Sequence, residues 1–100
     1  MSMTIKGIKM NISKCLKNFD IEKSEEVTTE VRGKHDLTNG YHFEDLEDGR
    51  IVMTWIDDSL NNIQKAEKLK VILEILDRHG FGDYMHLNKE NASIEIANFS

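Results

Sequence analysis

Apolar residues recur at two different spacings along this chain of 100 residues. Near its start they repeat every three or four positions, which places them on one stripe of a helix and predicts a helix over about residues 8–19. A longer run with the same spacing follows three capping candidates and ends near Gly80, a residue typical of helix ends. We expect this second helix to be the main helix of the core. Its capping candidates are Asp57, Asp58 and Ser59.

Between these helices the spacing of the apolar residues changes to two, as in a strand. Val27, Thr29 and Val31 alternate with polar residues. Two dipeptides that favour tight hairpin turns follow, Asn-Gly at 39–40 and Asp-Gly at 48–49, because a type I′ turn requires positive φ at both central residues. Two-residue turns at both places predict a meander of three strands. These strands cover about residues 26–38, 41–47 and 50–56.

The register of this meander decides which side chains face each other. Two-residue turns place His42 opposite Trp55, which leaves neither face of the sheet cleanly apolar. They also place His35 opposite Glu44. A carboxylate beside an imidazole can form a general acid-base pair, or it can be an ordinary cross-strand ion pair. No nucleophile or oxyanion motif accompanies the two residues, so we favour the ion pair.

The last part of the chain predicts a closing hairpin, in which "GFGDYMHL" is followed by the loop "NKEN" and the alternating segment "ASIEIANF". The element order is then α-β-β-β-α-β-β. Because every apolar face must be covered, we predict an α+β fold, a small antiparallel sheet of about five strands with two helices packed on one face. The length favours a single domain over residues 1–100.

Charge is unevenly distributed along the chain, whose net charge is −5. Residues 1–19 hold four lysines and no acid, whereas residues 20–58 hold twelve acids against four bases. A lysine-rich helix face is also seen on membrane-surface helices, but we favour a solvated face, since four lysines there need no lipid to explain them. The overall negative charge disfavours direct binding of nucleic acid, because phosphate is neutralised by Lys and Arg.

Candidate chemistry is sparse in this sequence. A single cysteine, Cys15, allows neither an intramolecular disulfide nor a cysteine metal cluster, which fits a reducing compartment. The four histidines lack metal-ligand spacing, and no glycine-rich loop precedes a helix as a phosphate site requires. No stretch resembles a secretory signal or a membrane span. We therefore expect a cytoplasmic protein without metal, cofactor or enzymatic activity.

The most unusual stretch is "YHFEDLEDGRIVMTWIDD" at residues 41–58, which carries six carboxylates and one arginine. The last two acids have a structural reason, because negative charge is favoured at the start of a helix. The acids around the second turn have no such reason, apart from Asp48, a normal turn residue. They are either a solvated edge of the sheet or a surface that attracts a basic partner, with nearby aromatic anchors. The predicted contact residues are Glu44, Asp45, Glu47, Asp48, Tyr41 and Phe43.

These features favour a small binding protein over an enzyme. The first hypothesis is a bacterial immunity protein that neutralises a cognate toxin of the nuclease type by occluding its basic active-site cleft, since nucleases keep a positive cleft for phosphate. One alternative is a phage inhibitor of host defence. Another is a secretion chaperone, because the element order resembles that of type III effector chaperones, although the chain lacks their final helix. That resemblance implies a homodimer, whereas the sequence itself leaves monomer and homodimer open.

Overall fold

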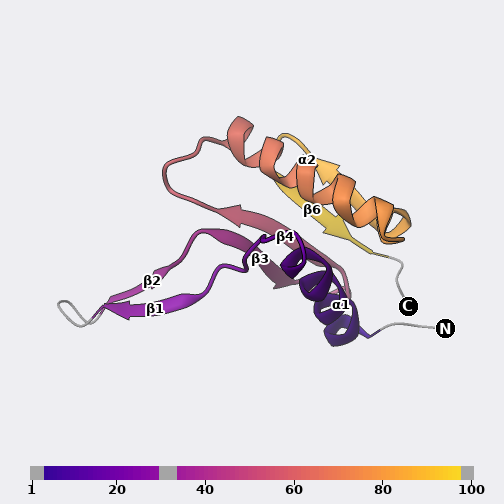
Figure 1. Ribbon diagram of the computed structural model, residues 1–100, viewed down its shortest axis with the longest axis horizontal. Coiled ribbons are helices and arrows are strands. Elements are labelled where there is room, and N and C mark those ends of the chain that lie inside the picture. Colours follow the sequence, from indigo (N-terminus) through magenta and orange to yellow (C-terminus); the bar gives the residue numbers. More distant parts are fainter. Residues whose placement is uncertain (1–3, 30–33, 98–100) are drawn as a thin grey trace.

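A computed structural model describes residues 4–29 and 34–97, and for residues 26–29 and 34–37 it describes the backbone alone. The described part contains two helices, a short 3₁₀ turn and six strands (Figure 1). In chain order these are α1 (Ile5–Lys17), β1 (Glu26–Thr29), β2 (Lys34–Leu37), β3 (Gly40–Asp45), β4 (Ile51–Ile56), α2 (Asn62–Arg78), η1 (Gly82–Tyr84), β5 (Met85–Asn88) and β6 (Ser93–Ile96). The predicted α+β class is confirmed.

The main sheet has four antiparallel strands in the order β3-β4-β6-β5, and both helices pack on one of its faces. The predicted sheet of about five strands is wrong in this detail, because the segment expected to be its first strand forms β1 and β2 of a separate ribbon, which puts four strands rather than three between the helices. Alternation along the strands sends every second side chain into the layer between the sheet and the helices. Fully burying an aliphatic side chain contributes about 1.5–3 kcal/mol, so the shared layer accounts for much of the stability. Its buried members are Ile8, Ile12, Leu16, Leu69, Ile72 and Leu76 of the helices and Tyr41, Phe43, Ile51, Met53, Ile94 and Ile96 of the sheet.

Both helices begin and end with specific backbone contacts. The Thr4 side chain accepts a hydrogen bond from the Gly7 backbone at 2.9 Å and caps α1. Asn61 and Gln64 form a capping box at the start of α2, so the prediction that residues 57–59 cap this helix is wrong. Gly80 is confirmed as the stop of α2, because its positive φ of 91° allows a Schellman-type ending.

The turn between β3 and β4 corrects the predicted register. Leu46 donates to the Arg50 carbonyl at 2.8 Å, and Gly49 at φ 87° donates back to the Leu46 carbonyl, so the loop has three residues rather than two. One extra loop residue shifts the pairing by one and moves side chains to the other face. Tyr41 therefore lies opposite Trp55, in place of the expected His42. The result is one apolar face and one polar face.

The Asn39-Gly40 dipeptide does not form the expected hairpin turn. Residues 26–38 are not one long strand, because β1 and β2 pair with each other in a separate ribbon that extends away from the sheet (Figure 1). His35 pairs with Thr28 in this ribbon, whereas Glu44 pairs with Val52. The predicted pairing of His35 with Glu44 is therefore wrong, both as the favoured ion pair and as the acid-base alternative.

Gly40 begins β3 at a point where another segment of the backbone lies alongside the strand. Residues 22–24 run beside it, and Ser24 donates to the Tyr41 carbonyl at 2.8 Å. A methyl group on Gly40 would lie 2.7 Å from the Ser24 backbone nitrogen, closer than side-chain carbons approach such atoms. Glycine is therefore required here by close approach as well as by its φ of 156°.

The closing hairpin follows the prediction. β5 and β6 are joined by a four-residue loop over residues 89–92, one position later than expected, and β6 pairs with β4 in the middle of the sheet. Within the described residues, neither helix is long and apolar enough to cross a membrane.

Candidate functional site

The four predicted acids lie around the β3–β4 turn, and all four are exposed. We call this group, Glu44, Asp45, Glu47 and Asp48, the acidic turn. Its side chains point in different directions, because neighbouring residues of a strand face opposite sides of the sheet. Asp45 lies on the side of the helices, whereas Glu44 lies on the polar face.

Two basic side chains fix the positions of two of these carboxylates. Lys9 of α1 donates to Asp45 Oδ1 at 2.8 Å and so links the helix to the end of β3. Arg50 donates to Asp48 twice, from its backbone nitrogen at 3.2 Å and from Nε at 2.7 Å. The Arg50 guanidinium also lies 3.5 Å from Glu95 of β6, which connects the turn to the centre of the sheet.

The contacts with Arg50 favour the ionised form of Asp48. The backbone N–H of Arg50, helped by its guanidinium, holds the pKa of Asp48 below its usual value of 3.8. Glu44 and Glu47 have no ion-pair partner among the described residues. Within that part of the chain, the acidic turn therefore has two paired carboxylates, Asp45 and Asp48, and two unpaired ones.

The two predicted aromatic anchors lie in the core. Tyr41 is 2% exposed and Phe43 is 9% exposed, and their rings pack edge to face with centroids 5.5 Å apart. Neither ring contributes to the surface beside the acidic turn. The alternation along β3 places the two residues on the same face of the strand, and this could be seen in the sequence. Only the correct pairing with β4 shows that this is the face covered by the helices.

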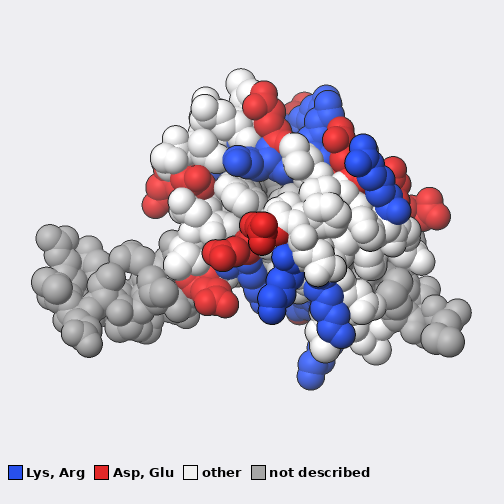
Figure 2. Space-filling model, viewed as in Figure 1, with Lys and Arg blue, Asp and Glu red and all other residues white. Residues whose placement is uncertain are grey.

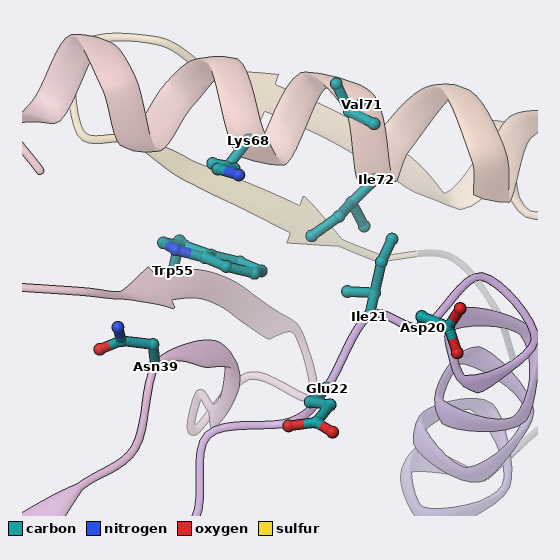
Figure 3. A pocket seen from close by; sticks show the side chains of 8 residues that line it. All are labelled: Asp20, Ile21, Glu22, Asn39, Trp55, Lys68, Val71 and Ile72. Atoms are coloured by element: carbon teal, nitrogen blue, oxygen red, sulfur yellow. The ribbon is translucent and has the colours of Figure 1, made fainter.

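A second candidate site, which sequence analysis did not find, is a hollow of about 380 Å³ at the other end of the β3–β4 hairpin (Figure 3). Trp55 of β4 lies on one side of it, and Ile21 and Ile72 point toward one another beyond the end of the ring. Its lining comes from the segment after α1, the residue before β3, the end of β4 and the middle of α2. These residues are Asp20, Ile21, Glu22, Asn39, Trp55, Lys68, Val71 and Ile72.

Trp55 gives this hollow its chemical character. The Lys68 ammonium lies 5.9 Å from the ring centroid, which is within the range of a cation–π contact. The indole Nε1 is buried and has no hydrogen-bond partner among the described residues. An apolar floor with polar groups at the rim is typical of pockets that receive a small ligand or a partner side chain. No sequence motif predicts the hollow, because its residues meet only through the tertiary fold.

The remaining candidates have structural roles. His79 bonds through Nδ1 to the Ile75 carbonyl at 2.8 Å, and its ring packs against Phe19. Asp57 accepts hydrogen bonds from the hydroxyl and the backbone N–H of Ser59, and these bonds lower its pKa. Among the side chains that the structure describes, those of residues 4–25 and 38–97, no group of three from His, Cys, Asp or Glu is placed to hold a metal ion.

No protein family, curated protein or solved structure matches this chain. Its function is therefore inferred from its own geometry.

Proposed function

We propose that the protein is a small acidic inhibitor that binds a basic protein through the acidic turn. In the specific form of this proposal it is an immunity protein, and its partner is a cognate nuclease-type toxin whose basic cleft it occludes. The observation that carries the proposal is the acidic turn itself, a cluster of four exposed carboxylates of which two, those of Asp45 and Asp48, are held in place by Lys9 and Arg50.

Fixed charges favour such a complex in two ways. A cluster of one sign attracts a partner of opposite sign and excludes partners of the same sign. A loop whose shape is already held by the ion pairs of Asp45 and Asp48 loses little conformational freedom on binding, so more of the interaction energy appears as affinity. Glu44 and Glu47 would contact lysines or arginines of the partner, while the pairs made by Asp45 and Asp48 preserve the shape of the loop.

The decisive variant removes charge without disturbing that shape. Glu44→Gln with Glu47→Gln changes the net charge by two and leaves both ion pairs of the turn intact. A matched control is Glu67→Gln with Glu74→Gln, which makes the same charge change at exposed positions of α2. The three proteins are immobilised and exposed to lysate of the source cell at low and at high salt, and captured proteins are identified by mass spectrometry.

We expect the native chain and the α2 control to capture the same basic protein at low salt, and the turn variant to lose it. The captured protein is then assayed for nuclease activity with and without the native chain, which should suppress that activity. Equal capture by all three chains would overturn the role of the acidic turn. A captured partner without toxic or nuclease activity would overturn the immunity assignment, and a stable homodimer of the isolated chain would favour the secretion-chaperone alternative.

A further inference from the structure

A groove of opposite charge runs along α1. It has a volume of about 450 Å³, and no carboxylate is among the residues that line it. Figure 2 shows basic side chains gathered over α1, whereas basic and acidic side chains alternate over α2. We call this feature the lysine groove. Its residues are Lys6, Lys9, Met10, Ser13, Lys14 and Lys23.

The groove follows from the pattern of the helix. Ile8, Ile12 and Leu16 bury one stripe of α1, and the lysines occupy the other sides of a helix that contains no acid. Lining residues of α1 spaced three or four apart lie on neighbouring turns, so their side chains form a row along the axis. Lys23 joins them from the segment beside β3, where its backbone pairs with Tyr41.

Most of this positive charge is not neutralised by the described part of the chain. Lys9 is paired with Asp45, whereas Lys6, Lys14 and Lys23 are exposed and have no ion-pair partner among the described residues. Met10 lies between them with half of its surface exposed, although it is a large apolar side chain. The flexible thioether side chain of Met10 offers an adaptable contact for an apolar group of a partner.

We propose that the lysine groove binds an acidic segment of a partner protein, with carboxylates on the lysines and an apolar side chain on Met10. Charge complementarity indicates an anionic occupant. A protein segment is favoured over nucleic acid because Met10 offers a contact for an apolar side chain and no aromatic side chain lines the groove for base stacking. The groove meets the acidic turn at the Lys9–Asp45 pair, but its exposed lysines lie outside that turn, and the inference does not depend on the proposed function.

The probe is a fluorescein-labelled peptide of Glu-Glu-Leu repeats, titrated with the full chain at low salt and followed by fluorescence anisotropy. The groove variant is Lys6→Gln with Lys14→Gln. The matched control is Lys70→Gln with Lys89→Gln, which makes the same charge change at exposed positions elsewhere. Circular dichroism establishes that each variant is folded.

We expect the native chain and the control to bind the peptide with affinities within about twofold of each other. The groove variant should bind about tenfold more weakly, which corresponds to about 1.4 kcal/mol lost with two exposed charge pairs. Met10→Ser should weaken binding by about threefold without changing its salt dependence, because it removes an apolar contact alone. Glu44→Gln with Glu47→Gln should leave peptide binding intact, which separates this site from the acidic turn.

Three results would overturn the proposal. The first is absence of peptide binding by the native chain, and the second is an equal loss in the groove variant and the control, which would indicate only a general charge effect. The third is tighter binding of a single-stranded oligonucleotide of equal charge, which would make the groove a phosphate site instead.

Discussion

The two ends of the β3–β4 hairpin are held by different forces. At the Gly40 end, the backbone of residues 22–24 lies directly against the strand, and Trp55 packs toward α2. At the other end, ion pairs to Lys9 and Arg50 hold an exposed loop. Close packing is sensitive to a single methyl group, whereas exposed ion pairs contribute little to stability. The Gly40 end therefore contributes to the stability of the fold, whereas the exposed turn can be altered with little loss of stability and can serve as a binding surface.

The largest effect is expected at Gly40. Gly40→Ala places a methyl group against the Ser24 nitrogen and should lower the free energy of unfolding by about 2–4 kcal/mol, measured by urea denaturation. Gly49→Ala is the matched control, because Gly49 also has positive φ but its added methyl meets no atom within 4 Å. Gly49→Ala should lower the free energy of unfolding by only about 1–2 kcal/mol, because a residue with a side chain is strained at positive φ. Equal losses of unfolding free energy in the two variants would show that residues 22–24 are not tightly packed against Gly40.

The next largest change in unfolding free energy is expected for substitution of Trp55. Trp55→Ala removes a partly buried ring, and we expect a loss of about 2 kcal/mol in the free energy of unfolding. Trp55→Phe keeps most of the ring and removes an N–H group that is buried without a partner, so it should change stability by less than about 1 kcal/mol. A large loss in the phenylalanine variant would indicate that Nε1 makes a stabilising hydrogen bond in solution.

The Lys9–Asp45 pair should contribute less. Its side chains are 28% and 51% exposed, and exposed pairs contribute about 0.2–1 kcal/mol. A double-mutant cycle with Lys9→Met and Asp45→Asn measures the coupling directly, and the value should fall further in high salt. A coupling well above 1 kcal/mol would mean that the charged end of the hairpin also supports the fold.

The smallest effect is the pH dependence of Asp48. Because its pKa is lowered in the folded chain, its ionised form favours folding above the ordinary value of 3.8, and this contribution disappears as the pH falls through the folded pKa. The difference in Tm between the native chain and Asp48→Asn should therefore be largest near neutral pH and vanish in strong acid. A difference that grew in acid would contradict the lowered pKa.

Much of the fold could be predicted from periodicity, and most of the errors came from single turn residues. The spacing of apolar residues identified both helices and the closing hairpin, because burial on one face imposes that spacing. The sequence Asp48-Gly49 indicated a turn but not whether the loop had two or three residues, and that difference moved Tyr41 and Phe43 from a presumed surface into the core.

The two candidate sites also differ in whether the sequence could locate them. The acidic turn could be located because its residues are adjacent in sequence, although its ion pairs to Lys9 and Arg50 depend on the fold. The hollow at Trp55 could not be located, because its lining combines residues from four segments that only tertiary packing brings together. The prediction for Asn39-Gly40 was wrong for a related reason. Gly40 is needed because the backbone of residues 22–24 lies close against it, and not because it forms a hairpin turn.

The measurement that most directly tests the separation of stability from recognition is made on Glu44→Gln with Glu47→Gln. The free energy of unfolding and the dissociation constant for the captured basic partner are measured on the same preparation, beside the native chain and the α2 control. We expect an unfolding free energy within about 0.5 kcal/mol of native and binding that is at least about tenfold weaker. Unchanged binding in the turn variant, or a loss equal to that of the control, would contradict the account.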